Sequence, residues 1–412
     1  MNEGNLFETQ EPTVYFKSSE TMEEVLNDSV QLIVTSPPYG KIKDYGNQNQ
    51  IGFVGTFDDY FKRLKQVWSE CYRILEPQCR MVINIGDQYL RTSEFGRYRV
   101  LSIASKIITD CLELGFDFLG DIVWQKISTT NTTGGCTLMG SIYYPRNGLL
   151  TYDYEHILIF KKYQGKRKKK VDPIIKEMSK IPLSEWKKWF TGHWKFPGVV
   201  QNEHIAMFPE ELPYRIIRMF SYIGDTVLDP FLGSGTTLKV AKSLFRRGIG
   251  YELNKEYKKI VDNKVEISKP GLFRDYQFLL YKLFEKTQSE KTEILFEKQK
   301  KKGILSIKNA EESEVVLDYL LIEEDIFNQD MIKNELNAKL KENTVLNYLE
   351  GKLINSDIQN YVILFNSKFD NDINLKPLLK AYLSKENLIG KIKIITMSDF
   401  LSDDFETSMF FQ

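Results

Sequence analysis

The residues best suited to chemistry form a glycine-rich turn at positions 228–237. The turn reads Leu-Asp-Pro-Phe-Leu-Gly-Ser-Gly-Thr-Thr. An apolar run at 225–229 predicts a buried strand before the turn, and apolar residues at helical spacing predict a helix after it. Glycines lack a Cβ atom, so a ligand can lie against bare backbone at the positive end of that helix. The pattern predicts a strand–turn–helix ligand site.

An acidic residue narrows the choice of ligand. Glu252 ends the next predicted strand, 249–252, about 20 residues beyond the turn, where α/β nucleotide sites hold ribose hydroxyls. A P-loop needs Lys where Thr236 stands, and a dinucleotide-binding turn needs a third glycine where Leu238 stands. A nucleoside cofactor without a pyrophosphate remains, and S-adenosylmethionine fits.

A second motif, Ser36-Pro37-Pro38-Tyr39, follows a predicted strand at 30–35. Two prolines cannot continue a central strand, so the chain must leave the sheet there. Alone, the tetrapeptide could be only a proline-stiffened turn. Its pairing with the glycine-rich turn favours a functional role.

Together the two motifs resemble the catalytic and cofactor motifs of DNA amino-methyltransferases. In that family the catalytic tetrapeptide is Ser, Asp or Asn followed by Pro-Pro-Tyr. Here it precedes the cofactor turn, which is the order of the permuted beta class that includes N4-cytosine restriction-modification methylases. The similarity covers residues 13–265, and further stretches match in the same order at 84–87, 154–158, 204–211 and 250–254. It implies methyl transfer from S-adenosylmethionine to an amino group of a base flipped out of double-stranded DNA.

The residue types of the tetrapeptide suit that reaction. An exocyclic amine is a poor nucleophile because its lone pair is delocalised into the ring, and acceptors around its hydrogens favour a pyramidal nitrogen. The Ser36 hydroxyl and the Pro37 carbonyl would be those acceptors, and Pro38 helps to rigidify the carbonyl. Tyr39 offers a face on which the base can stack. Methylation at a ring carbon would need a cysteine nucleophile, and none of the four cysteines follows a proline.

The resemblance also implies the cofactor contacts, which are Asp229, Phe231, Gly233, Gly235 and Thr236 in the turn, Glu252 at the ribose, and Phe208 and Pro209 beside the methionine moiety. Relatives often carry Gly-Asp after the first strand, where the acid can meet the adenine. This chain has Lys17-Ser18-Ser19 instead. Ser18 or Ser19 could substitute through a hydroxyl or backbone group.

The target base is predicted to be cytosine, methylated at N4. Serine in the first catalytic position favours cytosine within the family, and so does the amino-acid sequence of 204–212. Relatives that methylate adenine more often carry Asp in that first position. N6-adenine methylation is the alternative. A second alternative is a non-catalytic module that binds cofactor and DNA. A nuclease in the C-terminal part is a third, although no acid-acid-lysine cluster stands on a strand pair there.

DNA contacts are predicted at two groups of basic residues. Seven of the ten residues from 161 to 170 are basic, where this class usually inserts target recognition, although a solvated loop is the simpler interpretation. The second group lies between tyrosines after position 87. The candidates are Lys166, Arg167, Lys168, Lys169, Arg91 and Arg97. No metal site is predicted, Trp186 and Trp189 are expected in the core, and structural roles are expected for His156 and His204.

The fold class is predicted to be α/β, a three-layer Rossmann-like domain with a mostly parallel sheet and helices at 22–26, 57–75, 101–114 and from 209 to 220. The expected strands are 13–16, 30–35, 80–85, 121–124, 156–160, 225–229 and 249–252.

The methyltransferase domain is expected at 1–269. It would comprise a catalytic half (13–160), a target-recognition insert (161–203) and a cofactor half (204–269). Residues 270–412 form a smaller α/β domain, in which strands at 361–365 and 392–396 bracket a helix at 375–383. Its role, in DNA recognition or in oligomerisation, stays open.

Bulk properties fit this interpretation. The 412 residues are 42% hydrophobic and 27% charged, as in globular proteins, and net charge is near +5 for 1–270 and −5 for the remainder. No run of 18 apolar residues occurs and the start is polar, which predicts a cytoplasmic protein with free thiols. The expected partners are double-stranded DNA, a second copy of the chain as an option, and a cognate restriction endonuclease as genetic partner.

Overall fold

The structure is a computed structural model of the chain, which divides into two compact units. The first unit comprises 1–171 with 186–274, and the second comprises 172–185 with 275–412. The residues that the structure describes are 11–40, 48–52, 55–90, 92–127, 139–140, 146, 148–150, 152–166, 171–198, 208–266, 268, 276–289, 293–299, 302–308, 314–322, 361–367, 392–396, 400 and 402.

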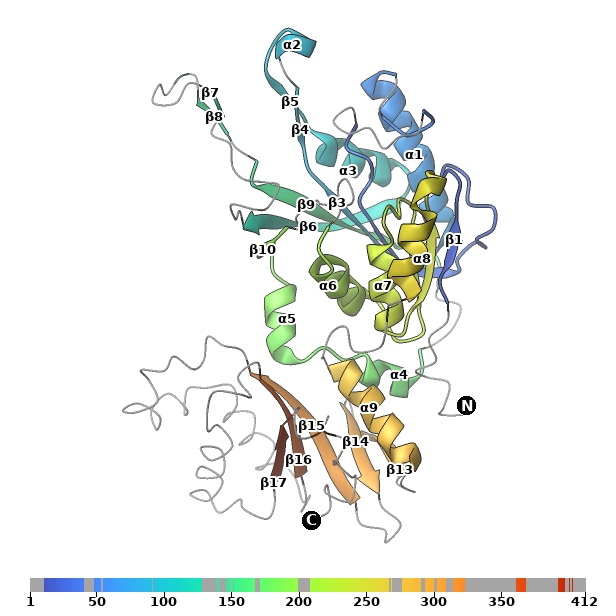
Figure 1. Cartoon of the computed structure of the whole chain (residues 1–412), viewed down its shortest axis with the longest axis vertical. Helices are drawn as coiled ribbons and strands as arrows, with labels where there is room; N and C mark the ends of the chain where they lie inside the picture. The colour runs from blue at the N-terminus through green and yellow to red at the C-terminus, as the bar shows by residue number, and fades with distance from the viewer. Residues whose placement is uncertain are drawn as a thin grey trace. The chain divides into compact units, whose positions relative to one another are not determined.

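The first unit is built of strands interspersed with helices (Figure 1). Its elements are β1 (Thr13–Tyr15), β2 (Val30–Thr35), α1 (Phe57–Ile74), β3 (Leu75–Ile85), β4 (Gln88–Leu90), α2 (Thr92–Phe95), β5 (Arg99–Leu101), α3 (Ile103–Glu113), β6 (Phe116–Ile127), β7 (Met139–Gly140), β8 (Gly148–Leu149), β9 (Tyr154–Lys162), β10 (His193–Pro197), α6 (Glu211–Phe220), β11 (Thr226–Asp229), α7 (Thr236–Ser243), β12 (Arg247–Tyr251), a 3-10 turn (Lys255–Tyr257) and α8 (Lys258–Glu266).

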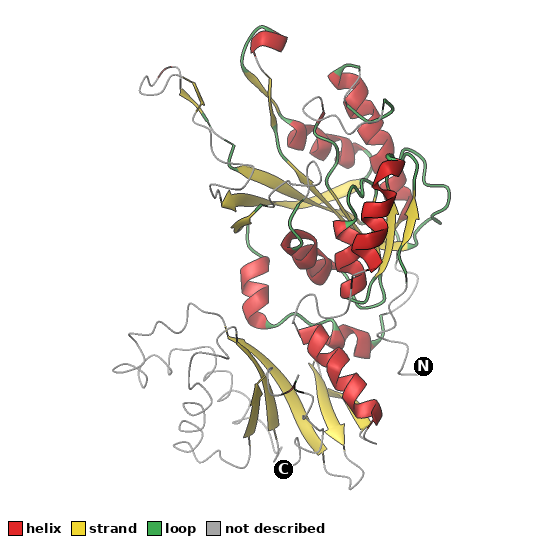
Figure 2. Ribbon diagram, viewed as in Figure 1, coloured by secondary structure: helices red, strands yellow, loops and turns green. Residues whose placement is uncertain are grey.

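The described strands of this unit form an eight-stranded sheet in the order β1-β12-β11-β2-β3-β9-β6-β10. Neighbouring strands run parallel, except that β9 is antiparallel to both β3 and β6. Helices cover both faces, with α1 and α3 on one side and α6 and α7 on the other (Figure 2). The predicted three-layer Rossmann-like fold is confirmed.

Helix α1 carries the largest part of the core. Its N-terminus has a complete capping box, in which Thr56 and Asp59 each accept a hydrogen bond from the other's backbone N–H. The predicted apolar face is buried: Tyr60, Leu64, Val67, Trp68 and Cys71 are at most 1% exposed. These side chains pack on β2 and β3, whose residues in the same cluster are also fully buried. Helix α1 therefore fixes the two strands that lead into the candidate site.

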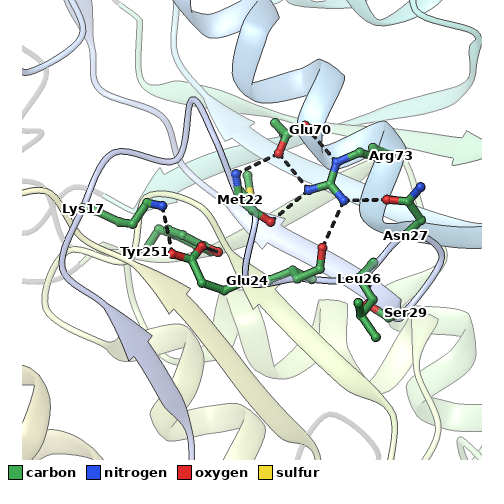
Figure 3. Close-up of polar contacts among 10 residues, drawn as sticks. Lys17, Met22, Glu24, Leu26, Asn27, Ser29, Glu70, Arg73 and Tyr251 are labelled. Atoms are coloured by element: carbon green, nitrogen blue, oxygen red, sulfur yellow. Dashed lines mark hydrogen bonds and ion pairs between the residues drawn. The ribbon is translucent and has the colours of Figure 1, made fainter.

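The helix expected at 22–26 does not form; those residues make a turn. The guanidinium of Arg73 on α1 donates to the carbonyls of Met22 (2.9 Å) and Val25 (3.0 Å), while Glu70 accepts from the backbone N–H of Met22 (Figure 3). A helix over 22–26 would leave the Met22 N–H and the Val25 carbonyl without partners of its own, whereas side chains of α1 bind both groups here. The Met22 carbonyl also accepts from the Val25 N–H within the turn. Tertiary contacts outweigh the weak local preference for helix.

Other expectations differ in extent. Strands β3, β6 and β9 are longer than predicted: β3 begins five residues earlier than expected, and β6 and β9 extend beyond both ends of the predicted strands. Trp189 is buried as expected, but Trp186 is 48% exposed and stacks on Phe190 with 3.9 Å between ring centroids. No helix in the described part of the chain is long and apolar enough to cross a membrane.

The second unit contains a mixed five-stranded sheet. Strands β13, β14 and β15 are antiparallel neighbours, whereas β15, β16 and β17 run parallel, as the predicted β–α–β arrangement of the last two strands requires. The helix predicted at 375–383 lies outside the described residues. The elements are α4 (Pro173–Met178), α9 (Tyr276–Ser289), β13 (Glu293–Gln299), β14 (Lys302–Lys308), β15 (Glu314–Ile322), β16 (Tyr361–Ser367) and β17 (Ile392–Thr396), while α5 (Leu183–Trp189) spans the division at 185/186.

A glycine on β12 is required by packing against the glycine-rich turn. A Cβ atom at Gly250 would lie 2.6 Å from Leu232 Cδ2 and 3.1 Å from Leu232 Cγ. We expect Gly250→Ala to lower the free energy of unfolding by about 1–3 kcal/mol, because Leu232 is buried and must shift. Gly192→Ala is the control: nothing lies within 4 Å of its Cβ position, and a change below about 1 kcal/mol is expected. Urea unfolding measures both, and equal effects would contradict the packing argument.

Candidate active site

The two sequence motifs meet because their strands are neighbours in the sheet. Strand β11 pairs in parallel with β2, with Val227 beside Leu32 and Leu228 beside Ile33. Ser36 follows the last residue of β2, and Pro230 of the glycine-rich turn follows Asp229, the last residue of β11. The carboxyl ends of parallel strands meet at one edge of a sheet, and ligands of open α/β sheets bind outside that edge. Segments nearly 200 residues apart in sequence therefore flank one location.

A pocket lies at this edge, with about 960 Å³ of space between protein atoms, part of it open to solvent. The whole tetrapeptide lines it together with most of the turn. The lining residues are Lys17, Ser18, Ser19, Ser36, Pro37, Pro38, Tyr39, Asn49, Gln50, Ile51, Phe208, Pro230, Phe231, Leu232, Gly233, Ser234, Thr236, Tyr251, Glu252, Leu253, Asn254 and Tyr257.

Asp229 is a predicted cofactor contact that the structure places behind the pocket wall. Its carboxylate is fully buried and accepts from the Thr35 hydroxyl (2.6 Å), the Thr237 hydroxyl (2.6 Å) and the Phe231 N–H (3.0 Å). Burial raises the pKa of Asp229 to about 6, while the hydrogen bonds act in the opposite direction. Asp229 does not line the pocket, so the geometry gives it a positioning role between β2, the turn and α7.

Gly233 and Gly235 shape the turn in different ways. Gly233 lines the pocket with φ +55°, and its N–H donates to Glu252 Oε2 at 2.8 Å. Gly235 begins α7 with φ +89°, and a Cβ there would lie 3.3 Å from Val261, so it serves the backbone bend and the packing of α8. Gly235 is absent from the pocket wall, as is Pro209, whose neighbour Phe208 lines it.

Glu252 directly follows β12 and lines the pocket. Its carboxylate accepts from the N–H groups of Gly233 and, at 2.7 Å, of Asn254. Desolvation raises the pKa of Glu252 to about 7, despite those two donors. The side chain is therefore a mostly desolvated carboxylate that can exchange its N–H partners for the hydroxyls of a ligand.

The backbone after β2 is fixed from α1. The Tyr60 hydroxyl donates to the Pro38 carbonyl at 2.8 Å, and Gly40 adopts φ +55° directly after Tyr39. Gly86, at the end of β3, lies against the Tyr39 ring: a Cβ there would be 3.5 Å from Tyr39 Cε1. These contacts hold Ser36–Tyr39 in place without a ligand.

The segment after β1 completes one wall. The Ser18 hydroxyl donates to Glu20 (2.9 Å), which pairs with Arg63 of α1 at 2.7 Å. Lys17 pairs with Glu24 at 2.9 Å, and the Tyr251 hydroxyl donates to the same carboxylate at 3.0 Å (Figure 3). Ser18 and Ser19 both line the pocket. They lie after the first strand, where relatives often carry Gly-Asp and this chain does not.

Several lining residues had no signal in the sequence. Asn49, Gln50 and Ile51 follow a stretch without apolar periodicity, and they reach the pocket because Arg63 binds the carbonyls of Asn49 (2.9 Å) and Gln50 (3.2 Å). Tyr257 lies in a 3-10 turn that the sequence did not indicate. Tyr251, Leu253 and Asn254 also line the pocket, and their place beside Glu252 in the matched stretch 250–254 is a signal that could have identified them.

Of the predicted DNA contacts, two lie among the described residues. Arg97 and Lys166 are exposed, whereas Arg91, Arg167, Lys168 and Lys169 lie outside the described residues, as does His204. Arg97 belongs to the arm formed by β4, α2 and β5, which leaves the carboxyl end of β3 and projects from the body of the unit (Figure 1).

Three further residues of types that can do acid–base or nucleophilic chemistry have structural surroundings instead. His156 pairs with Asp121 at 2.6 Å, which raises the pKa of the imidazole, and neither lines the pocket. Cys71 and Cys111 are free and buried, and burial raises the pKa of both thiols. Among the described residues, no group of three or more His, Cys, Asp and Glu side chains could hold a metal ion.

The pKa of Glu252 makes stability depend on pH. The folded protein holds the proton up to about pH 7, whereas the unfolded side chain loses it near 4.5, so this group lowers the free energy of unfolding as pH rises through that window. The expected fall is about 3 kcal/mol, at 1.36 kcal/mol for each pKa unit.

Replacing Glu252 tests that expectation. Glu252→Gln should reduce the fall in stability between pH 5 and 7, most clearly above pH 6, because Asp229, with a pKa of about 6, contributes its own fall below that pH. Urea unfolding of the unliganded protein measures the pH dependence. The slope is the readout, because an amide cannot accept from both N–H groups and the variant loses some stability at every pH. Parallel curves for the two proteins would show that Glu252 titrates normally.

Comparison with known proteins agrees with this geometry. A profile described as DNA methylase, for the N6/N4 group, matches residues 30–263, which is more than half of the chain. The chain is 36% identical over 291 residues to the type II methyltransferase M.MjaI of Methanocaldococcus jannaschii, covering 64% of this chain and 94% of that protein. It is 32% identical to M.MthZI of Methanothermobacter thermautotrophicus, covering 61% and 76%.

A solved structure gives the same fold. It is a protein from Thermus thermophilus classed as a DNA modification methylase, in complex with S-adenosyl-L-methionine. The two are 32% identical with a TM-score of 0.52, over 63% of this chain and 96% of the other. With the motifs, the pocket and the family match in agreement, the chain belongs to the N6/N4 family of DNA methylases.

Proposed function

We propose that this chain transfers a methyl group from S-adenosylmethionine to the exocyclic N4 of cytosine in double-stranded DNA. The observation that carries the proposal is that Ser36–Tyr39 and Gly233 line the same pocket. Methyl transfer needs an amine and a methyl donor to be aligned in one cleft, and positioning of this kind supplies a large part of the rate.

The pocket fits the proposed cofactor chemically. Phe231, Leu232 and Ile51 supply apolar surface for an adenine ring, and the Glu252 carboxylate can accept from ribose hydroxyls. Ser234 and Thr236 offer hydroxyls beside the first turn of α7, where a negatively charged group is favoured. The cofactor supplies an electrophilic methyl group on a sulfonium. Lys17–Ser19 stand at the wall where relatives place an acid at the adenine.

The tetrapeptide would bind and orient the base. Ser36 Oγ and the Pro37 carbonyl accept hydrogen bonds from the amino group, which leaves the nitrogen lone pair free to attack. Tyr60 holds the Pro38 carbonyl, so the loop is positioned before a base enters. Tyr39 offers its ring as a stacking surface, and Gly86 beside it adds no side chain that would cover the ring edge.

The choice of cytosine rests on Ser36 in the first catalytic position and on the similarity of residues 204–212 to N4-cytosine relatives. N6-adenine remains the alternative product of the same site. For the DNA itself, we propose phosphate contacts from Arg97 on the β4–α2–β5 arm and from Lys166, with Arg91, Arg167, Lys168 and Lys169 completing the two groups.

The wider setting is proposed on the same basis. Type II methyltransferases among the relatives favour a restriction-modification system in the prokaryotic cytoplasm, with a cognate endonuclease as genetic partner. We propose a methyltransferase domain at 1–269, and a role in DNA recognition or dimerisation for 270–412. The range proposed as target-recognition insert, 161–203, contributes to both compact units.

Mass spectrometry of digested DNA tests the reaction. Duplex DNA incubated with the protein and S-adenosylmethionine should yield N4-methyldeoxycytidine. N6-methyldeoxyadenosine as sole product would overturn the choice of base, and absence of both would overturn the activity. Ser36→Ala should lower the methylation rate by about a hundredfold to a thousandfold, as loss of one transition-state hydrogen bond typically does. Ser105→Ala, an exposed serine on α3, is the matched control and should retain full activity.

Salt dependence tests the role of Arg97. If it contacts one phosphate, Arg97→Gln should reduce the slope of log K against log salt by about 0.9. Arg247→Gln is the control, because this exposed arginine begins β12 at the amino end of the sheet, opposite the pocket edge. Fluorescence anisotropy on a duplex at several salt concentrations gives both slopes. An unchanged slope for Arg97→Gln would remove this arm from the proposed interface.

A further inference from the structure

Lys264 lies behind the pocket wall and binds two hydroxyls that line the pocket. Its ammonium, on α8, donates to Ser234 Oγ at 2.6 Å and lies 3.3 Å from Thr236 Oγ1. The two hydroxyl oxygens are 3.4 Å apart, and both side chains are less than 10% exposed. Lys264 itself does not line the pocket, so it can reach a ligand only through these hydroxyls.

The chemistry of these groups sets their hydrogen-bond direction. An ammonium has donors and no acceptor, whereas a hydroxyl has one donor and two acceptor lone pairs. Both hydroxyl oxygens therefore act as acceptors towards Lys264. The two hydroxyls also lie within hydrogen-bond distance of each other, and at least one of their two hydrogens remains available to point into the pocket. A nearby positive charge also polarises the O–H groups and strengthens the bonds that they donate. The wall at Ser234 and Thr236 is thus biased towards a negatively charged ligand group.

We propose that Lys264 is a positioning residue that orients the Ser234 and Thr236 hydroxyls to donate to the α-carboxylate of the cofactor. This inference rests on the proposed function, because the carboxylate is the anionic group of S-adenosylmethionine. At the other end of the turn the Gly233 N–H already donates to Glu252, so this donor is not available to an anion. The two groups together orient a ligand that has hydroxyls at one end and a carboxylate at the other.

A pair of ligands separates this role from simple support of the fold. Decarboxylated S-adenosylmethionine keeps the adenosine, the sulfonium and the amine and lacks only the carboxylate. Lys264→Met, which keeps the length of the side chain and removes its charge, should raise the Kd of S-adenosylmethionine by about tenfold to a hundredfold. The Kd of the decarboxylated ligand should change by less than about twofold, because this ligand lacks the carboxylate that the two hydroxyls would bind. Calorimetry on the full chain measures both.

Two further variants complete the design. Lys264→Arg keeps a positive donor and should restore most of the affinity for S-adenosylmethionine. Lys259→Met removes an exposed charge from the same helix and should leave both ligands unaffected. An equal loss for both ligands in Lys264→Met, or no loss for either, would overturn the proposal. Failure of the unmodified protein to bind S-adenosylmethionine would instead overturn the proposed function.

Discussion

The site depends on the buried carboxylate of Asp229 and its hydrogen bonds to three elements. Thr35 is the last residue of β2, Phe231 lies in the glycine-rich turn, and Thr237 lies in the first turn of α7. A carboxylate removed from water is costly unless its lone pairs are satisfied, so these donors must stay in place. Because Ser36 follows Thr35 directly, the same contacts set the separation between the two halves of the pocket.

Glu252 is a second acid that binds the glycine-rich turn, but it lies on the side of the turn that faces the pocket. It accepts from Gly233 and Asn254, and burial raises its pKa to about 7. Asp229 is enclosed and has a structural role, whereas Glu252 faces the pocket, where a ligand can reach it. Two acids on neighbouring strands thus have separate tasks, decided by which side of the turn they face. The turn lies between them and exposes its backbone to the pocket.

Support for the opposite wall comes from α1 rather than from local structure. Arg73 and Glu70 bind the backbone of the segment after β1, Arg63 binds Glu20 and the carbonyls at 49–50, and Tyr60 binds the Pro38 carbonyl. Helix α1 is in turn held by its buried apolar face on the sheet. Burial of that face therefore positions polar groups on three separate stretches of the pocket. No local sequence pattern indicates that these partners contact α1.

The sequence alone determined the family, the α/β class, the two motifs and the apolar face of α1. These features depend on local backbone chemistry: glycine at positive φ, proline after a strand, and periodic apolar residues. Tertiary structure decided the rest. It placed Asp229 behind the wall, replaced a helix at 22–26 by a turn bound to Arg73, brought residues 49–51 to the pocket and set Lys264 against Ser234. The reason is that long-range hydrogen bonds join residues whose proximity exists only once the strands are ordered in the sheet.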